Sequence, residues 1–515
     1  MLYFIVFLSG ASVMVLELVG SRIVAPYLGT SIYIWTALIG VILGALSVGY
    51  VWGGTIADRA PTYERLAFLF LCAAVATALV CPLQYPVLGY LQSSALDMRL
   101  SAVLATFVLF VVPSVLLGAV NPLAFRLALV DMNRSGEVAG RLYAVSTIGS
   151  IAGTFLAGFV LFSVLGGNSV ILAVATVLLL CSVLASPKKQ RLWKVCVLLG
   201  IGVIHSLSNV RADELAKSGW HEFDTPYQRA IVVEESEGTG SKRIVRRLIT
   251  DPFGSQSEMY RDSPFELASD YAELYDLAFV FKPDLRLALM LGGGAYSYPR
   301  YFNKRYGDVT MDVVEIDPGL TELSRRFFDL PDNERLNIVH EDGRAFLNRT
   351  SHTYDALFMD AFSAPPSVPF QLTTIEAVSL MSERTAEDGV VFINIVSGID
   401  GDEGKFLRAE VQTFEAVFPE VRLYQVQPSA GRATPQSLIL VGLKRKLGRQ
   451  PLAPGTSDYL RGLMSREIDL STVKRDMHVL TDDFAPVEHY LLPTACKMLP
   501  TVRASGRMKW SASVP

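Results

Sequence analysis

The chain has 515 residues, which is too long for one ordinary hydrophobic core, so at least two domains are expected. Hydrophobic residues make up 51% of the chain and charged residues only 19%, and the mean hydropathy is +0.35. These values favour a membrane protein, although the sequence after about Val210 has the composition of an ordinary soluble protein. A net charge of -4 without any basic-aromatic stripe excludes nucleic acid as an expected partner.

Chemistry that needs a metal or a phosphate-binding loop finds no support. The six histidines have no metal-ligand spacing, and neither a GxSxG nor a GxxxxGK[ST] motif occurs. The five cysteines lie mostly in apolar segments, where they are expected to be small buried hydrophobic side chains. We therefore expect no metal site, no disulfide framework and no phosphate transfer.

The N-terminal half contains seven apolar runs that can cross a bilayer, which takes about 20 residues per helix. These runs are Leu2–Pro26, Ile34–Ala57, Leu66–Leu83, Leu100–Leu127, Leu142–Leu165, Ser169–Ala185 and Leu192–Ser208. The first lacks a basic region and a small-residue cleavage site, so we expect a membrane helix there and not a removable signal peptide. The sequence thus predicts a multi-pass protein of the inner (cytoplasmic) membrane, with the lipid bilayer as a partner.

Basic residues gather in three alternate loops between these runs. They are Arg59 and Arg65, then Arg126, Arg134 and Arg141, then Lys188, Lys189, Arg191 and Lys194. By the positive-inside rule these loops face the cytoplasm. A complete seventh span would place the following domain outside, away from intracellular nucleoside cosubstrates, so either that segment does not cross, the count differs, or the domain is external. On chemical grounds we expect a cytoplasmic soluble domain.

The pattern changes after His221 to short strands, as in RAIVVEE and RRLIT, which indicate a small β-rich unit. LRLALMLGGGAYSYPR then predicts a buried strand, a glycine-rich turn and the start of a helix. Gly292, Gly293 and Gly294 allow a ligand to approach the backbone closely beside a helix N-terminus, which favours a nucleotide site.

Acidic residues follow the next three predicted strands. Glu315 ends the strand in MDVVEIDP, roughly twenty residues after the glycines, where a carboxylate can bind both ribose hydroxyls. Asp342 in EDGR suits an adenine edge, and Asp360 follows YDALFM, where ligands lie in open α/β sheets. Each acid has the alternative of only capping the next helix. With GVVFINIVS and QSLILVGLK as later strands, the alternation predicts a mostly parallel, doubly wound sheet.

The order GGG, VEID, EDGR and MDAF resembles the spermidine synthase family, a branch of the class I methyltransferase fold, over about Phe223 to Lys444. Tyr227-Gln228 matches the family's Tyr-Gln pair, and Asp251 with Gln256 loosely matches its Asp-Gly-x-x-x-Gln region. The membrane half, DAFS and LTDDFAPVE look like the bacterial membrane-fused members. We therefore expect a multi-pass α-helical membrane bundle, then an α/β Rossmann-like (class I methyltransferase / spermidine synthase) domain with a small β-rich N-terminal subdomain. The expected boundaries are 1–209 for the bundle, 210–262 for the subdomain, 263–495 for the Rossmann-like domain and 496–515 for a polar tail.

The resemblance implies aminopropyl transfer from decarboxylated S-adenosylmethionine to a diamine such as putrescine, leaving methylthioadenosine. Because the amine must lose a proton to attack, a nearby carboxylate must hold the cation and take the proton, and Asp360 matches the family's catalytic aspartate. The implied cosubstrate contacts are Gln228, Gly292, Gly293, Gly294, Glu315, Asp342 and Gly343, and the implied substrate contacts are Gln256, Tyr271 and Ser363. Soluble members commonly form dimers, so a homodimer is implied by analogy.

Two positions depart from the family pattern, because Ala295 and Ser363 stand where the family has aspartates that hold cationic amines. Asp482, Asp483 and Glu488 could resupply negative charge, with a solvated loop as the alternative. Three functions therefore stay open. They are an aminopropyltransferase-like enzyme, an S-adenosylmethionine-dependent methyltransferase, whose chemistry needs no paired carboxylates, and a non-catalytic transporter or sensor that binds a nucleoside or polyamine.

Overall fold

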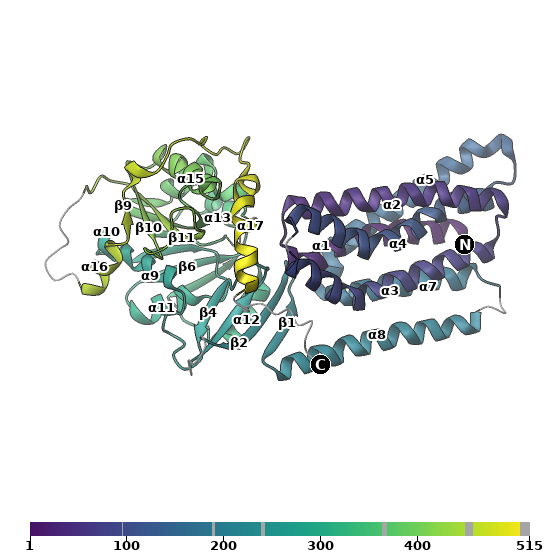
Figure 1. Ribbon diagram of the computed structural model, residues 1–515, viewed down its shortest axis with the longest axis horizontal. Helices are drawn as coiled ribbons and strands as arrows, with labels where there is room; N and C mark the ends of the chain where they lie inside the picture. Colours follow the sequence, from purple (N-terminus) through teal and green to yellow (C-terminus); the bar gives the residue numbers. More distant parts are fainter. Residues whose placement is uncertain (95, 188–190, 238–242, 363–367, 449–456, 505–515) are drawn as a thin grey trace. The chain divides into compact units, whose positions relative to one another are not determined.

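The computed structural model describes residues 1–94, 96–187, 191–237, 243–362, 368–448 and 457–504. The chain forms two compact units, Met1–Arg229 and Ala230–Met508, and each has its own hydrophobic core (Figure 1). Helix α8 (Arg191–Lys217) runs without interruption through position 209, where the sequence places the end of the bundle.

The first unit is a helical bundle, because its sequence consists of long apolar runs joined by short polar loops. Side-chain caps mark two helix starts, where Thr62 accepts a hydrogen bond from the N–H of Arg65 and Asp97 accepts one from the N–H of Arg99. The elements are α1 (Leu2–Leu28), α2 (Ile32–Arg59), α3 (Tyr63–Ser93), α4 (Met98–Ala128), η1 (Met132–Arg134), α5 (Ser135–Leu156), η2 (Ala157–Leu161), α6 (Phe162–Val164), α7 (Gly167–Ala185), α8 and strand β1 (Trp220–Asp224).

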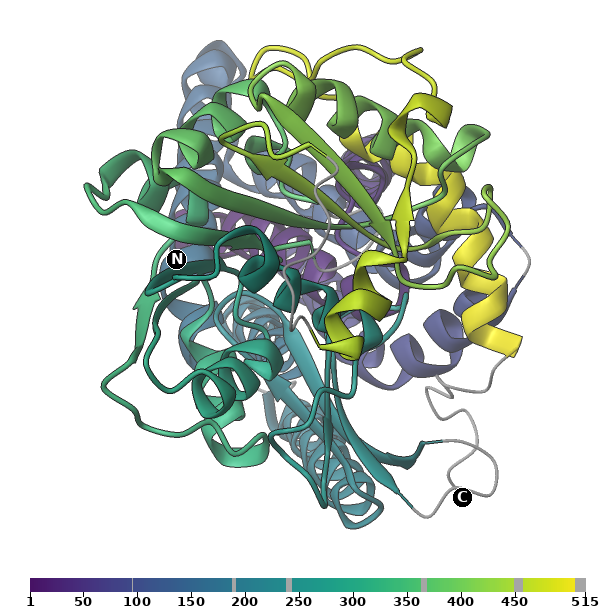
Figure 2. The same cartoon turned by 90° about the vertical axis from the view of Figure 1, so that its left-hand side faces the viewer.

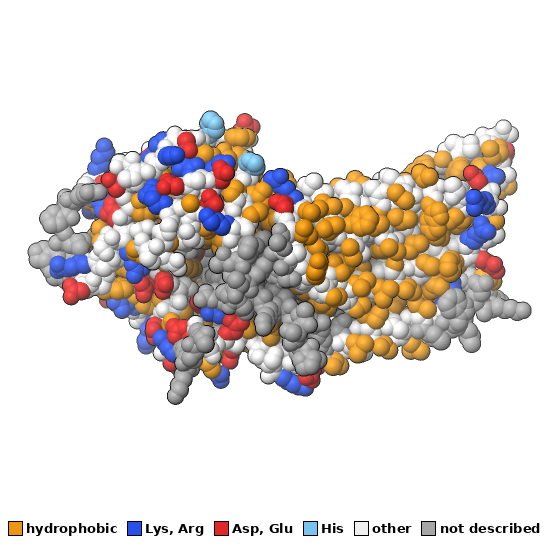
Figure 3. Space-filling view, viewed as in Figure 1, with side chains coloured by type: hydrophobic (Ala, Val, Ile, Leu, Met, Phe, Trp, Pro, Cys, Tyr) orange, Lys and Arg blue, Asp and Glu red, His pale blue; other side chains and the backbone are white. Residues whose placement is uncertain are grey.

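Six helical segments of the described chain are long and apolar enough to cross a membrane. They are Leu2–Leu28, Ile32–Arg59, Tyr63–Gln92, Met98–Ala128, Met132–Val164 and Gly167–Ala185. They correspond to the first six predicted spans, and hydrophobic side chains cover much of the face of this unit shown in Figure 3. The predicted seventh span lies within α8, where several side chains are outside the described residues.

Small residues let α1 and α5 pack closely. A Cβ atom added at Gly149 would collide with the backbone of Phe7, and one added at Gly153 would collide with the backbone of Ala11. The small-residue spacing in STIGSIAGTFLAG therefore serves helix packing.

The second unit begins with the small antiparallel sheet that the alternating sequence predicts. Strand β2 (Arg229–Ser236) pairs with β3 (Ile244–Ile249), which pairs with β4 (Ser257–Tyr260). Residues 229–233 of β2 are all buried, whereas β4 alternates between buried and half-buried residues, as expected for a strand with one face on a core.

The main sheet has eight strands in the order β12-β10-β11-β9-β8-β5-β6-β7. The five strands β5 to β9 pair with one another in parallel, as the β-α alternation predicts. The sheet is nevertheless mixed, because β11, formed by QSLILVGL, lies antiparallel between β9 and β10. The strands are β5 (Leu287–Leu291), β6 (Thr310–Glu315), β7 (Leu336–His340), β8 (Tyr354–Met359), β9 (Thr385–Ser397), β10 (Glu420–Gln425), β11 (Gln436–Leu443) and β12 (Glu467–Ile468).

Helices cover both faces of this sheet (Figure 2). Consecutive strand residues alternate between two cores, so Leu289 and Leu357 lie in one and Met290 and Phe358 in the other. Helix α17 runs across position 496, where the sequence places the start of a polar tail, and ends at Ala504. The helices are α9 (Asp270–Glu273), η4 (Leu274–Leu277), α10 (Ala278–Phe281), α11 (Ser297–Arg305), α12 (Pro318–Phe327), α13 (Gly343–Arg349), η5 (Phe370–Leu372), α14 (Ile375–Glu383), η6 (Asp402–Gly404), α15 (Lys405–Glu415), α16 (Asp458–Met464), η7 (Leu470–Thr472) and α17 (Val487–Ala504).

Candidate functional site

The carboxyl ends of β6, β5, β8 and β9 are neighbours at one edge of the main sheet. Parallel strands deliver the residues that follow them to the same edge, which is where ligands lie in open α/β sheets. The glycine turn follows β5, Glu315 ends β6 and Asp360 follows β8. The tertiary structure therefore brings together three predicted site elements that are far apart in the sequence.

Glycine is required in the turn after β5. Gly292 has φ 95° and Gly294 has φ 54°, which lie in the left-handed region that favours glycine. A Cβ atom at Gly292 would also collide with the backbone carbonyl of Asp360. The turn after β5 and the turn after β8 are thus packed directly against each other.

Glu315 holds the glycine turn in place. Its side chain is buried, and Oε2 accepts hydrogen bonds from the N–H groups of Gly293 at 2.8 Å and Gly294 at 3.0 Å. Oε1 accepts one from the N–H of Asp317 at 2.9 Å. Burial raises the pKa of Glu315, and these three backbone hydrogen bonds oppose the rise. A carboxylate has about four acceptor positions, so a ribose hydroxyl would share this oxygen pair with the turn.

Asp360 lies in a half-buried polar cluster. Its Oδ2 accepts a hydrogen bond from the hydroxyl of Tyr271 at 3.1 Å, and its Oδ1 accepts one from Nδ2 of Asn394 at 3.1 Å. Burial raises the pKa of Asp360, while the hydrogen bonds from Asn394 and Tyr271 lower it. A carboxylate in such surroundings takes up a proton more readily than an exposed one, as a general base must.

The hydroxyl of Tyr271 donates to Asp360 directly, and its contact with a substrate stays a prediction. Asn394 was not predicted. It lies on β9, and the one signal in the sequence is a polar residue inside the otherwise apolar run VVFINIV. Its Oδ1 atom is buried and has no hydrogen-bond partner among the described residues.

Asp342 caps the helix that follows it. Its Oδ1 accepts a hydrogen bond from the N–H of Ala345 at 3.0 Å, at the start of α13. Gly343 is the first residue of that helix, and a Cβ atom there would meet Leu372 and Leu291 only at 3.6 Å and 3.8 Å. The capping alternative is thus realised for Asp342, and its adenine contact stays a prediction.

The small sheet contributes residues beside the glycine turn. Gln256 precedes β4, and its Cγ lies 3.8 Å from the position of a Cβ at Gly294. The N–H of Ala295 donates to Oγ of Ser257 at 3.0 Å, and the Ala295 side chain is fully buried. A methyl group enclosed in protein therefore stands at position 295.

The remaining predicted residues have other contacts or are not described. Ser363 is outside the described residues. Gln228 belongs to the first unit, where its N–H donates to Oγ1 of Thr225 at 3.0 Å. Asp482 forms an ion pair with Arg344 at 2.9 Å and accepts a hydrogen bond from Thr374, so its charge is already paired within the protein. The described residues contain no group of three or more His, Cys, Asp or Glu side chains placed to hold a metal ion.

Comparison with known proteins finds sequences and structures that are similar to this chain. Residues 270–427 match the family described as "Spermine/spermidine synthase domain". A "Probable polyamine aminopropyl transferase" of Bifidobacterium longum is 26% identical over 252 residues, which cover 46% of this chain and 55% of the relative, so only about half of that relative's length is spanned. "Polyamine aminopropyltransferase 1" of Streptomyces coelicolor is 25% identical over 414 residues, covering 75% of this chain and 74% of that protein.

Among solved structures, a "probable spermidine synthase" from Corynebacterium glutamicum is similar with a TM-score of 0.42 and 20% identity. The similarity covers 52% of this chain and 97% of that one.

Proposed function

This chain carries a spermine/spermidine synthase domain, and on that premise we propose that it is a membrane-bound aminopropyltransferase-like enzyme. Its substrates would be decarboxylated S-adenosylmethionine and a diamine such as putrescine. The observation that carries the proposal is the cluster at the sheet edge, where half-buried Asp360 accepts hydrogen bonds from Tyr271 and Asn394 next to the glycine turn.

Asp360 would act as the acid/base group. The amine nitrogen gives a proton to the Asp360 carboxylate and attacks the carbon beside the sulfonium. The new N–C bond forms as the C–S bond breaks, its electron pair neutralises the sulfur, and methylthioadenosine leaves. The raised pKa of Asp360 favours its role as proton acceptor.

The cosubstrate would lie over the glycine turn, with its ribose near Glu315 and its adenine near Asp342 and Gly343. The turn offers backbone that a ligand can approach closely, and Glu315 fixes its conformation through the N–H groups of Gly293 and Gly294. Gln256 beside Gly294 would contact the aminopropyl side of the ligand.

The amine half of the site relies on Asp360 and neutral partners. The free Oδ1 of Asn394 can accept an N–H from an amine, and a buried methyl group stands at Ala295, where the family has a carboxylate. A dication depends more strongly than a monocation on having several carboxylates around it. We therefore expect a smaller preference for diamines over monoamines than two further aspartates would give.

The direct test uses the purified full-length chain in detergent. Binding of methylthioadenosine, decarboxylated S-adenosylmethionine and S-adenosylmethionine is measured for the wild type, Glu315→Ala and Asp360→Asn, with Glu387→Ala as an exposed-residue control. Products with putrescine and with a monoamine are then identified.

The proposal predicts that methylthioadenosine forms with an amine, that Asp360→Asn binds the nucleoside but forms no product, and that Glu315→Ala loses binding. S-adenosylhomocysteine as the product would identify a methyltransferase instead. Binding of the nucleoside without any turnover would identify a sensor or transporter, and no binding at all would overturn the nucleoside site.

A further inference from the structure

Helix α8 begins at the end of the first unit that carries the basic loops, which we call the basic end; it is marked by Arg59, Arg65 and Arg126. Lys194, near the start of α8, is buried and donates hydrogen bonds to Oγ of Ser182 at 2.6 Å and to Oγ of Ser186. Ser182 in turn donates to the carbonyl of Ala67 at 2.5 Å, at the start of α3. These contacts fix the start of α8 beside the last turn of α7.

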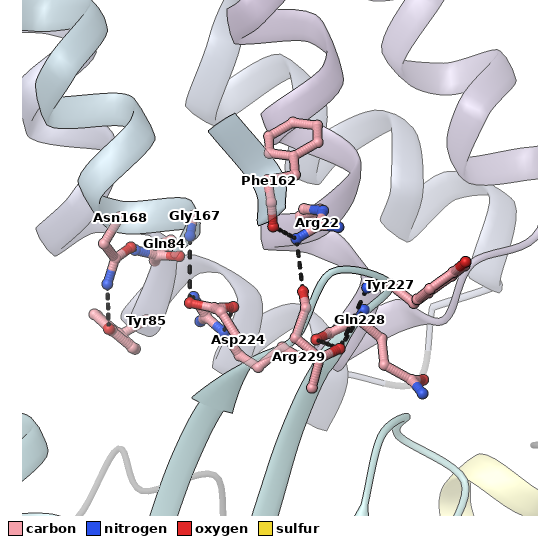
Figure 4. A network of polar contacts seen from close by, with 11 residues as sticks. Arg22, Gln84, Tyr85, Phe162, Gly167, Asn168, Asp224, Tyr227, Gln228 and Arg229 are labelled. Atoms are coloured by element: carbon pink, nitrogen blue, oxygen red, sulfur yellow. Dashed lines mark hydrogen bonds and ion pairs between the residues drawn. The ribbon is translucent and has the colours of Figure 1, made fainter. Parts of the chain in front are cut away.

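The chain that leaves α8 contacts the opposite end of the same unit (Figure 4). Asp224 accepts a hydrogen bond from the N–H of Gly167, the first residue of α7, at 3.3 Å. Arg22, in the last part of α1, donates to the carbonyl of Thr225 at 3.1 Å and to that of Pro226. Because α7 ends at the basic end, its first residue lies at the far end of the bundle.

The contacts at this far end are specific. Asp224 also pairs with Arg229, whose Nε lies 3.0 Å from Oδ1, and a Cβ atom at Gly166 would collide with the Asp224 carboxylate. Arg22 further donates to the carbonyl of Phe162 at 3.4 Å and stacks over its ring at 4.4 Å. Residues 224–229 are therefore held on the end of the bundle formed by α1, α6 and α7.

Helix α8 is long enough to join the two ends. Its 27 residues extend about 40 Å at 1.5 Å per residue, whereas the hydrocarbon core of a bilayer is about 30 Å thick. The stretch 195–210 contains no Asp, Glu, Lys or Arg. This uncharged stretch, and not the charged ends of α8, can therefore lie in hydrocarbon.

The two faces of α8 fit this location. Ile201 is buried in the core of the bundle, and Val197 and Ile204 pack against it. The opposite face is apolar and exposed at positions spaced by one helical turn. These residues, with their exposed fractions, are Leu199 (65%), Val203 (56%), Leu207 (61%) and Val210 (56%). This row continues the hydrophobic side surface of the other spans, so acyl chains are its matching partner (Figure 3).

We propose that α8 is a seventh membrane span and that the chain from Ala230 onward emerges on the outer face. The basic loops mark the cytoplasmic side, and residues 224–229 lie at the other end of the bundle. The six other candidate spans of the described chain all end at or before Ala185. The described residues after α8 therefore contain no further candidate span that could lead the chain back to the cytoplasm. The geometry of the first unit thus favours the external alternative over the cytoplasmic domain that the cosubstrate chemistry suggests.

The test is labelling of single cysteines in intact cells by a membrane-impermeant maleimide. Glu387→Cys reports on the second unit, where this side chain is almost fully exposed, and Asn133→Cys reports on the basic loop after α4. Leu199→Cys reports on the exposed face of α8. The wild-type chain gives the background of the five native cysteines.

We expect Glu387→Cys to react in intact cells, Asn133→Cys to react only after permeabilisation, and Leu199→Cys to stay unreactive in both because alkylation needs water. Labelling of Glu387→Cys only after permeabilisation, together with Asn133→Cys, would overturn the proposal. So would ready labelling of Leu199→Cys in either preparation. The result is independent of catalysis, so failure of the topology and failure of the enzymatic proposal are separate outcomes.

Discussion

Nδ2 of Asn394 lies 3.1 Å from Oδ1 of Asp360, although 34 residues separate them in the chain. Adjacent parallel strands create this pair, because β8 ends beside β9. The amide donates to the carboxylate and so stabilises its ionised form.

Removal of this donor should therefore raise the pKa of Asp360. We expect Asn394→Ala to move the acidic limb of the kcat/KM profile for aminopropyl transfer to higher pH. The matched control is Asn337→Ala, whose amide donates to Asp312 at 2.9 Å in the same geometry but away from the sheet edge. An unchanged limb in Asn394→Ala, or an equal change in Asn337→Ala, would contradict the assignment of Asp360 as the titrating base.

Gly292 cannot be replaced without disturbing Asp360. An alanine at this position would have to adopt φ 95°, and its Cβ atom would collide with the Asp360 carbonyl. Gly292→Ala should therefore lower the free energy of unfolding by about 1–3 kcal/mol and weaken methylthioadenosine binding. Gly462→Ala is the control, since a Cβ atom there meets nothing within 4 Å. The measurements are the melting temperature and a methylthioadenosine titration. Equal effects of the two substitutions would argue against the strained turn.

An aspartate at position 295 should not strengthen amine binding. The Ala295 side chain is fully buried, and an aspartate there would be placed in protein with its pKa raised by desolvation. As the pH rises, the carboxyl group ionises in the unfolded chain before it can do so in the native protein, and this favours unfolding. Ala295→Asp should therefore be more destabilised at pH 8 than at pH 5. Melting temperatures at both pH values test this, with Ala295→Ser as the uncharged comparison. Tighter putrescine binding by Ala295→Asp would show that the position faces the substrate after all.

The burial of Asp251 should make the stability of the protein depend on pH. Burial raises the pKa of Asp251 to about 7, so the native state holds this proton where the unfolded chain has already lost it. The stability contribution of the protonated form is complete below the unfolded pKa and is lost as the pH rises towards about 7, at roughly 1.4 kcal/mol per pH unit.

Asp251→Asn removes this titration but keeps an oxygen that can accept the N–H of Phe253. Its melting temperature relative to the wild type should therefore rise between pH 4.5 and pH 7 and then level off. Asp308→Asn, on an exposed loop, should follow the wild type at every pH. A constant difference between Asp251→Asn and the wild type would mean that Asp251 is ionised in the native protein.

The sequence by itself determined the local elements of this protein. Apolar runs of bilayer length predict helices wherever backbone groups must be satisfied within the segment, and the first six runs became α1 to α7 with their short breaks. Alternation of strand and helix patterns predicts a parallel sheet, and the glycine turn, Glu315 and Asp360 follow the strands expected to carry them. These features depend on neighbouring residues, which a sequence shows directly.

Only the tertiary structure decided which distant residues meet. The antiparallel insertion of β11, the pairing of Asn394 with Asp360, and the enclosure of Ala295 depend on strand order and packing, which no local pattern encodes. The same is true of α8. Its sequence allows a helix on either side of the membrane or across it, whereas the contacts of Lys194 hold its start at one end of the bundle and those of residues 224–226 hold the following chain at the other.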